Sequence, residues 1–96
     1  MKNIFLISLL SSLLMAGNGA SIYAKCAKCH GKHGEKKAVG LSGIIAKRSP
    51  SLTIKQLKAY KSGTLDLYGM GSVMKKHVSK LTDSDIKAVA KYISHL

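Results

Sequence analysis

The clearest hydrophobic pattern in the chain lies near its C-terminus. Four apolar residues recur at the i, i+3, i+4 and i+7 positions that share one face of a helix: Ile86, Val89, Ala90 and Ile93. Thr82 stands before this stripe as an N-cap, and Asp85 completes a capping box with it. The pattern predicts a final helix that starts after Thr82 and buries one apolar face.

Two further helices are predicted earlier in the chain. Residues 17–31 form the first, with Asn18 as its N-cap. The second starts at Ile54, because Thr53 opens a capping box there. It ends at Gly63, since glycine adopts the left-handed conformation of a helix C-terminus without strain.

In the two segments between these helices, the apolar residues show no sustained periodic spacing. Residues 31–48 carry four glycines, and residues 64–80 centre on Gly69-Met70-Gly71, with a helical turn predicted only over residues 73–78. No strand-like alternation occurs in residues 17–96. The sequence therefore predicts an all-α domain of three main helices and two long loops. Loops of that length are uncommon in a compact domain unless they enclose something.

The first sixteen residues have the composition of a secretory signal peptide. Lys2 supplies a positive start, and residues 4–14 form an apolar run that is too short for a membrane span. We place the cleavage after Ala16, since a cut after Gly19 or Ala20 would remove the start of the first helix. The expected product is one exported domain, residues 17–96, in the periplasm and without a permanent membrane span.

The chain is strongly basic. It holds 16 lysine and arginine residues against 4 aspartate and glutamate residues, a net charge of +12 that falls to +11 when Lys2 leaves with the signal segment. A charge of this size favours an acidic partner. Nucleic acid is not expected, because the chain has no binding motif and few aromatic residues. An acidic protein surface or an anionic membrane face fits the composition.

The candidate cofactor-binding motif is Cys26-Ala27-Lys28-Cys29-His30. Two cysteines separated by two residues and followed at once by histidine have the C-x-x-C-H spacing that attaches a c-type haem. On one helical turn both sulfur atoms face the same way and can each form a thioether with one haem vinyl group. His30 then lies beneath the ring as an axial iron ligand. The motif predicts one covalently attached haem c per chain, bound by Cys26, Cys29 and His30.

Three other uses of the two cysteines compete with haem attachment. A zinc site needs about four ligands, but the chain has no second cysteine pair and its other histidines form no pair at ligand spacing. A thioredoxin-like dithiol needs a βαβ context that the helical pattern does not provide. A disulfide across two intervening residues would add little stability to a chain of this size. The function that competes under this interpretation is a binding module without haem, which would be colourless.

An iron bound by His30 on one side has a second axial position that is either filled or open. Met70 and Met74 are the only methionines outside the predicted signal segment, and both lie in the loop before the final helix. Methionine sulfur suits electron transfer because it stabilises ferrous iron, whereas an open position suits ligand binding or peroxide chemistry. Met74 is the first choice because it stands in a predicted helical turn; Met70 is the second choice, and His77 is a rival. Either methionine could instead fill a gap in the core.

Together these motifs resemble the small bacterial class I cytochromes c of the c-553 type. The likeness covers nearly all of residues 17–96 and is carried by four segments: Cys26–Gly31, Leu57–Gly63, Val73-Met74 and Leu81–Ser94. It implies the class I cytochrome c fold and a soluble one-electron carrier that is not an enzyme. A haem enzyme or a gas or redox sensor is the alternative, and it would need an open or displaceable sixth iron position.

The resemblance also assigns roles to residues. It implies Met74 as the distal iron ligand, and it implies that the first helix packs on the last through Gly19, Tyr23 and Tyr92. Many members use the carbonyl of a proline after the haem motif to orient the proximal histidine. Residues 38–43 contain no proline, so another main-chain carbonyl of this loop is expected to accept the proton of His30.

We expect a monomer that exchanges electrons with the acidic faces of redox proteins. The donor would be of the quinol–cytochrome c oxidoreductase type, and the acceptor a terminal oxidase or a peroxidase. The lysines expected to dock on these faces flank the haem motif and the proposed methionine: Lys25, Lys28, Lys32, Lys75 and Lys76.

Overall fold

A computed structural model of the chain describes residues 18–40 and 42–96. The predicted signal segment, residues 1–16, lies outside the described residues, as do Gly17 and Leu41. Elements follow in this order: an N-terminal helix over residues 18–30, the 3₁₀ turn η1 (Ala38–Gly40), α2 (Pro50–Ser62), the 3₁₀ turn η2 (Leu67–Gly69), α3 (Gly71–Val78) and α4 (Asp83–Ser94). The described part of the chain contains no strand, and the predicted all-α class is confirmed.

The last helix, α4, forms as its pattern predicts. The Thr82 hydroxyl accepts a hydrogen bond from the Asp85 amide at 3.1 Å, and the Asp85 carboxylate accepts one from the Thr82 amide at 3.0 Å. This closed capping box satisfies two amides that the first turn leaves without partners. The four residues of the predicted apolar stripe are the buried residues of α4, so this helix supplies most of the core.

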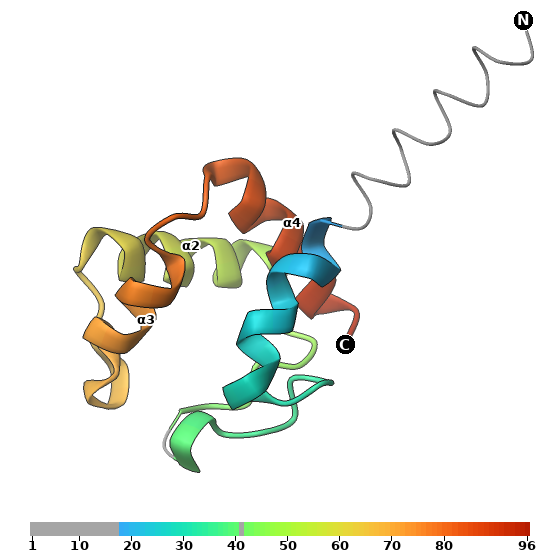
Figure 1. The fold of residues 1–96 in the computed structure, drawn as a ribbon, viewed down its shortest axis with the longest axis horizontal. Helices are drawn as coiled ribbons and strands as arrows, with labels where there is room; N and C mark the ends of the chain where they lie inside the picture. Colours follow the sequence, from blue (N-terminus) through green and yellow to red (C-terminus); the bar gives the residue numbers. More distant parts are fainter. Residues whose placement is uncertain (1–17, 41) are drawn as a thin grey trace, which may run out of the picture.

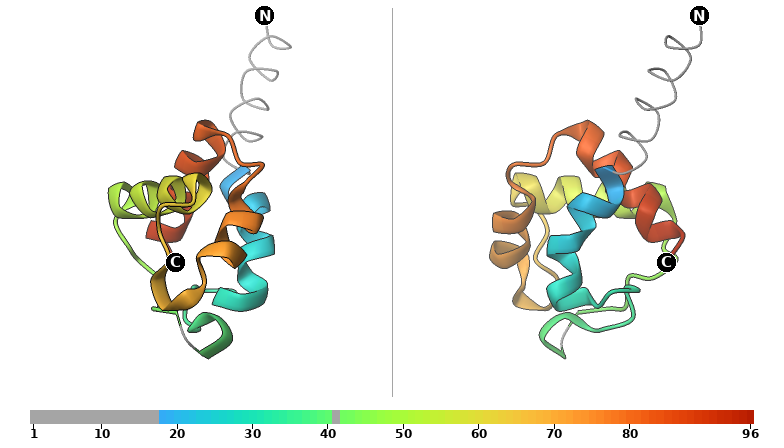
Figure 2. Two further views of the ribbon diagram at one scale, coloured as in Figure 1. Left: turned by 90° about the vertical axis from the view of Figure 1, so that its left-hand side faces the viewer. Right: turned by 45° about the vertical axis from the view of Figure 1, so that its right-hand side comes forward.

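The N-terminal helix packs closely on α4 (Figures 1 and 2). A Cβ atom added to Gly19 would lie 2.6 Å from the Ala88 carbonyl oxygen and 3.0 Å from Tyr92 Cβ. The two helices can therefore approach this closely only because the residue is glycine. One turn later the rings of Tyr23 and Tyr92 lie 5.5 Å apart. This is the packing that the resemblance implies.

The start of α2 differs from the prediction. The helix begins at Pro50, a full turn before Ile54, and its cap is Ser49, whose hydroxyl accepts a hydrogen bond from the Leu52 amide. Proline favours the first helical position and holds the residue before it in an extended conformation, which is what an N-cap needs. The capping box predicted at Thr53 is therefore wrong, because Thr53 lies inside the helix and is buried. The predicted stop at Gly63 is confirmed, with φ 81° and ψ 15°.

The segment before α4 is more regular than predicted. A helical turn was expected over residues 73–78, whereas α3 starts at Gly71 and continues to Val78. The Asp66 carboxylate accepts a hydrogen bond of 2.8 Å from the Gly71 amide. A Cβ atom on Gly71 would lie 2.6 Å from the Leu65 carbonyl oxygen, so the chain folds back here at glycine. This tertiary support, which sequence periodicity does not reveal, places Met74 on a regular helix.

The helices form a partial shell. α2 packs against both α4 and α3. Figure 2 shows the N-terminal helix and α3 on neighbouring sides of the molecule, with residues 31–40 and 42–48 below them. Side chains from all of these elements face one interior hollow. The predicted long loops thus lie around a space.

Candidate haem site

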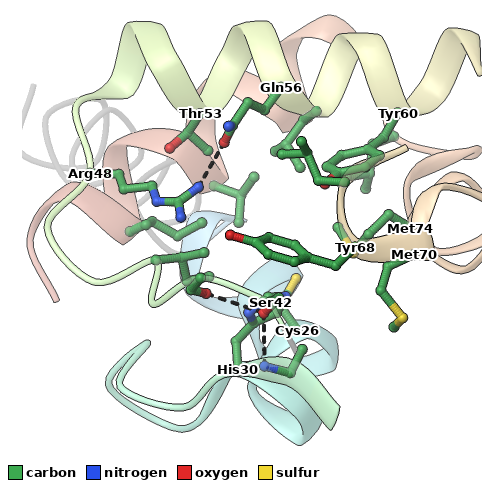
Figure 3. Close-up of a pocket in the computed structure, with 18 residues that line it drawn as sticks. Cys26, His30, Ser42, Arg48, Thr53, Gln56, Tyr60, Tyr68, Met70 and Met74 are labelled. Atoms are coloured by element: carbon green, nitrogen blue, oxygen red, sulfur yellow. Dashed lines mark hydrogen bonds between the residues drawn. The ribbon is translucent and has the colours of Figure 1, made fainter. Parts of the chain in front are cut away.

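The interior hollow has two connected lobes. The arginine lobe holds about 850 Å³ of empty space, part of it open to solvent, and is distinguished by Arg48, Thr53 and Gln56 in its wall. The cysteine lobe holds about 1280 Å³, part of it open to solvent, and is distinguished by Cys29 and His77. Six residues line both lobes: Cys26, His30, Ala38, Met70, Met74 and Leu81. Figure 3 shows the arginine lobe, whose mostly apolar wall suits an apolar ligand.

The two cysteines lie on the last turns of the N-terminal helix. Cys26 is partly buried and Cys29 is exposed, and both thiols are free. Their spacing puts them on one face of the helix, and each lines the cysteine lobe. Burial raises the pKa of the Cys26 thiol, which keeps it protonated at neutral pH. The structure thus brings both cysteines to the wall of the cysteine lobe.

His30 follows them and is almost completely buried, with 8% of its surface exposed. Burial is the main cause that lowers the pKa of its imidazole, and electrostatic interactions with Arg48 and His77 lower it further. The neutral form, which is the form that binds metals, is therefore favoured. Nδ1 is buried and has no hydrogen-bond partner among residues 18–40 and 42–96. The loop carbonyl expected to accept its proton is not found there.

Hydrogen bonds hold the end of the haem motif in place. The buried Tyr23 hydroxyl donates to the Gly31 carbonyl oxygen at 2.7 Å, and the Lys36 amide donates to the His30 carbonyl oxygen at 3.0 Å. Gly31 has φ 86°, a conformation that favours glycine. The chain therefore leaves the N-terminal helix directly after His30 and turns beneath the hollow.

Both candidate methionines line both lobes. Met70 precedes α3, and Met74 lies one turn into it, with its amide bonded to the Met70 carbonyl oxygen at 2.9 Å. Figure 3 shows the two side chains on the side of the hollow formed by η2 and α3. His77 is exposed and lines only the cysteine lobe. The structure brings both methionines to the hollow, so the choice between them rests on further argument.

A scan against protein families matches the cytochrome c family over residues 16–96. The chain belongs to the cytochrome c family. A cytochrome c-553 from Helicobacter pylori (strain J99) is 41% identical over 86 residues, which cover 90% of this chain and 85% of the relative. A cytochrome c-553 from Nitratidesulfovibrio vulgaris (strain Miyazaki F) is 36% identical over 87 residues, 88% of this chain and 82% of the relative. The resemblance inferred from the motifs is confirmed.

Membership of the cytochrome c family means a covalently attached haem c with its iron and a role in electron transport. The residues around the hollow fit that cofactor. Two free thiols and a buried imidazole, whose neutral form is favoured, line the hollow, and the remaining wall is mostly apolar. Conversely, no three His, Cys, Asp or Glu side chains converge on a metal site within the described residues, so the zinc alternative gains no support.

All five predicted docking lysines are exposed: Lys25, Lys28, Lys32, Lys75 and Lys76. Lys25 lines the cysteine lobe, and so does Lys80, which was not among the five. Val39 and Val73 also line this lobe and are 70% and 42% exposed. The mouth therefore combines apolar and cationic side chains.

Sequence reasoning missed three residues of the cytochrome's pocket. Arg48 donates from Nη1 to Gln56 Oε1 at 2.8 Å and from Nε to the Ile44 carbonyl oxygen at 3.2 Å. Thr53 is 6% exposed and was assigned to a helix cap instead. Thr53 and Gln56 are three residues apart. This spacing is compatible with a capping box, but it also places two residues on one face of a helix, so it could have indicated that both face the pocket.

Within the described residues, no helix is both long enough and apolar enough to cross a membrane.

Proposed function

We propose that this cytochrome is a periplasmic mono-haem electron carrier with histidine and methionine on its iron. The haem would be held by thioethers to Cys26 and Cys29, with His30 as the proximal ligand and Met74 as the distal ligand. One observation carries the proposal: Cys26 and His30 from the N-terminal helix and Met74 from α3 line the same hollow. Bound there, the haem supplies an iron that changes between the ferrous and ferric states.

The protein side chains have separate tasks in this proposal. Cys26 and Cys29 would hold the haem covalently, each through addition of its S–H across one vinyl double bond, with no leaving group. His30, whose neutral form is favoured by burial, would offer a nitrogen lone pair to the iron. Met74 would offer sulfur, which stabilises ferrous iron and leaves no position for a substrate. Such a site favours electron transfer over chemistry on a bound ligand.

Helix geometry favours Met74 over Met70. Met74 lies in the second turn of α3, whose start is held by the bond from the Gly71 amide to Asp66. Met70 precedes that helix, with φ −100° and ψ 10°, and has glycine on both sides. A ligand on a regular helix loses less conformational entropy when it binds iron than one in a glycine-flanked turn.

The absorption spectrum tests the distal ligand. The ferric protein should show the weak far-red band of methionine sulfur on iron. Met74→Ala should abolish this band, and the matched variant Met70→Ala should keep it. Loss of the band in Met70→Ala alone would transfer the role to Met70. A wild-type protein with covalent haem but no such band would overturn methionine ligation and leave either His77 or an open sixth position.

The positive charge would guide docking of the carrier. Lys25 and Lys80 line the cysteine lobe next to exposed Val39 and Val73, and the chain as a whole is strongly basic. Electrostatic attraction of this kind speeds encounter with an acidic face by about 10- to 1,000-fold at low salt. The partners would be the acidic faces of a quinol–cytochrome c oxidoreductase and of a terminal oxidase or peroxidase.

Stopped-flow oxidation of the ferrous protein by ferricyanide, a small anion, measures the charge around the haem edge. The rate should fall by at least about tenfold between roughly 0.01 M and 0.5 M ionic strength. Removing Lys25 and Lys80 (K25Q/K80Q) should flatten this dependence more than K55Q/K91Q, a control that removes two lysines outside the hollow. Equal slopes in both double variants would contradict the docking role.

Export is tested by the mass of the purified native protein. Cleavage after Ala16 predicts the mass of residues 17–96 plus one haem. A mass that retains residues 1–16 would contradict the predicted signal peptide and leave the haem assignment intact.

A further inference from the structure

The helix that carries Met74 is short and weakly packed. α3 has eight residues, and only its first and last residues, Gly71 and Val78, are buried. A helix of this length is unstable in water unless other contacts hold it. Met74 itself is half-buried. The position of Met74 therefore depends on what holds the two ends of α3.

The face of α3 toward the hollow adds little support. Met70, Val73, Met74 and His77 follow one another at helical spacing, and all four line the cysteine lobe. Val73 is 42% exposed, and His77 is exposed as well. This face borders the hollow instead of packing against another helix, so the support must come from elsewhere.

Asp66 holds the start of α3. Met70, the residue before the helix, forms no side-chain cap, so the first amides of α3 lack the partner that an N-cap usually supplies. The Asp66 carboxylate takes this place and accepts a hydrogen bond of 2.8 Å from the Gly71 amide. The Met70 amide bonds to the Leu67 carbonyl oxygen at 3.0 Å. These two bonds close residues 66–71 into a tight loop directly before α3.

This loop contains a strained residue. Tyr68 and Gly69 have φ values of 56° and 70°. Glycine adopts this left-handed conformation freely, whereas tyrosine does so only where other contacts hold it. Loss of the bond between Asp66 and Gly71 would let the loop relax, and the start of α3 would move with it.

Lys61 holds the other end of α3. This half-buried lysine lies in the last turn of α2, and its Nζ atom donates a hydrogen bond to the Leu81 carbonyl oxygen. The Leu81 amide donates to the carbonyl oxygen of Val78, the last residue of α3, at 3.0 Å. Lys61 thus ties α2 to the turn in which α3 ends.

The two bonds act on one helix from different parts of the chain. Asp66 precedes α3, and Lys61 belongs to α2. Both are ionised side chains bonded to main-chain groups, and such bonds are stronger than bonds between neutral groups. Neither side chain lines the arginine lobe or the cysteine lobe. Each can therefore influence Met74 only through the main chain of α3.

We propose that Asp66 and Lys61 are positioning residues that keep the Met74 sulfur on the iron. This proposal rests on the proposed function, because it takes Met74 as the distal ligand. With both bonds in place, α3 holds Met74 against the hollow. When either bond is lost, α3 moves more freely and the bond between sulfur and iron opens more often.

Imidazole binding measures how often that bond opens. Imidazole occupies the sixth position of ferric iron only after the methionine sulfur has left. At saturating imidazole the rate of the absorption change therefore equals the opening rate. At about pH 8 imidazole is mostly uncharged, so its binding responds little to the charge that a substitution removes.

Substitutions of Asp66 test the first end of the helix. Asp66→Ala removes the acceptor for the Gly71 amide and should raise the opening rate at least about tenfold. Asp66→Asn keeps an oxygen that can accept this bond, so its opening rate should stay within about threefold of the wild type.

Substitutions of Lys61 test the second end. Lys61→Met removes the donor but keeps an apolar side chain of similar length, and it should raise the opening rate at least about fivefold. Lys61→Arg keeps a donor and should have a smaller effect. Lys58→Met is the matched control, because Lys58 is an exposed lysine one turn earlier in α2, and it should open at the wild-type rate.

Two measurements separate positioning from a general loss of stability. Gly19→Val weakens the contact between the N-terminal helix and α4 and leaves both ends of α3 intact, so it should raise the opening rate less than Asp66→Ala does. Amide hydrogen exchange in the ferrous protein needs no added ligand. Asp66→Ala should accelerate exchange at the Met74 amide more than at the Ile86 amide of α4, because only the former lies in α3.

Two outcomes overturn the positioning role. A wild-type opening rate in Asp66→Ala or in Lys61→Met removes the role from that residue. An equal rise of the opening rate in Gly19→Val, at the same loss of stability in urea, assigns the effect to general loosening. Failure of the proposed function is recognised separately, because a wild-type protein without methionine on its iron lacks the far-red band before any imidazole is added.

Discussion

The two halves of this cytochrome are stabilised in different ways. Where the N-terminal helix crosses α4, the side chains of Tyr23, Val89 and Ile93 are at most 4% exposed and form one cluster. Where α2 meets α3, Val78 of α3 is buried, but Thr53 is the only buried residue of α2. The nearby Leu67 and Tyr68 are 40% and 62% exposed. One half is closed by protein packing, and the other half surrounds space for a cofactor.

The non-glycine residues with a left-handed backbone conformation lie in the segments around the hollow rather than in the packed helices. Val39, Lys47 and Tyr68 have φ values of 54°, 62° and 56°, in the left-handed region that favours glycine. All three lie in the segments around the hollow, and Val39 and Tyr68 line it. Each such residue costs about 1–3 kcal/mol and persists only where surrounding contacts hold it. We therefore expect the second half to depend on contacts with the haem more than the first half does.

The largest expected effect comes from removing the cofactor. The double variant C26A/C29A cannot form thioethers, so its second half loses the contacts that haem supplies. We expect hydrogen exchange at the amides of α2 and α3 to accelerate at least about tenfold more than at those of α4, because stability is not uniform across a structure. Exchange that accelerates equally in all helices, measured by NMR against the haem-loaded protein, would show that the two halves do not differ.

A smaller effect is expected from Gly19→Val in the packed half. The added Cβ atom would meet the Ala88 carbonyl oxygen at 2.6 Å, so the two helices must separate. Overpacking of this kind costs about 1–3 kcal/mol, which urea unfolding of the haem-loaded protein can measure. Ala20→Val, on an exposed position of the same helix, is the matched control and should cost less. Equal losses in both variants would argue against close helix packing.

The smallest expected effect comes from Tyr23→Phe, which removes the bond to the Gly31 carbonyl oxygen. It should lower the free energy of unfolding at pH 7 by about 0.5–1.5 kcal/mol. Burial raises the pKa of Tyr23 from 10.0 to about 12, so the folded protein keeps a proton that the unfolded chain loses above pH 10. The stability contributed by Tyr23 is therefore complete below pH 10 and declines as the pH rises toward 12.

The difference between wild type and Tyr23→Phe should accordingly shrink above pH 10 in urea unfolding experiments. Tyr92→Phe serves as the control at pH 7, because its hydroxyl has no hydrogen bond among residues 18–40 and 42–96, and it should cost less than Tyr23→Phe. A wild-type advantage over Tyr23→Phe that does not change between pH 9 and pH 12 would contradict the role given to burial.

Local signals were sufficient for part of the fold and part of the site. The Thr82 cap, the Gly63 stop and the attachment motif each depend on residues within a few positions of one another, and all three lie as predicted. Two local signals competed at the start of α2. Ser49-Pro50 and Thr53 each mark a helix start, and burial of Thr53 against the hollow agrees with the first.

The amino-acid sequence by itself determined the helical class, the α4 face and the haem chemistry, because periodicity, caps and a five-residue motif are properties of neighbouring residues. Only the tertiary structure decided that α3 runs as a full helix from Gly71 and that Arg48 joins Thr53 and Gln56 in the wall of the arginine lobe. The physical reason is that each depends on contacts between segments: Asp66 holds the start of α3, and a loop residue meets a face of α2. Such contacts exist only after the elements have packed.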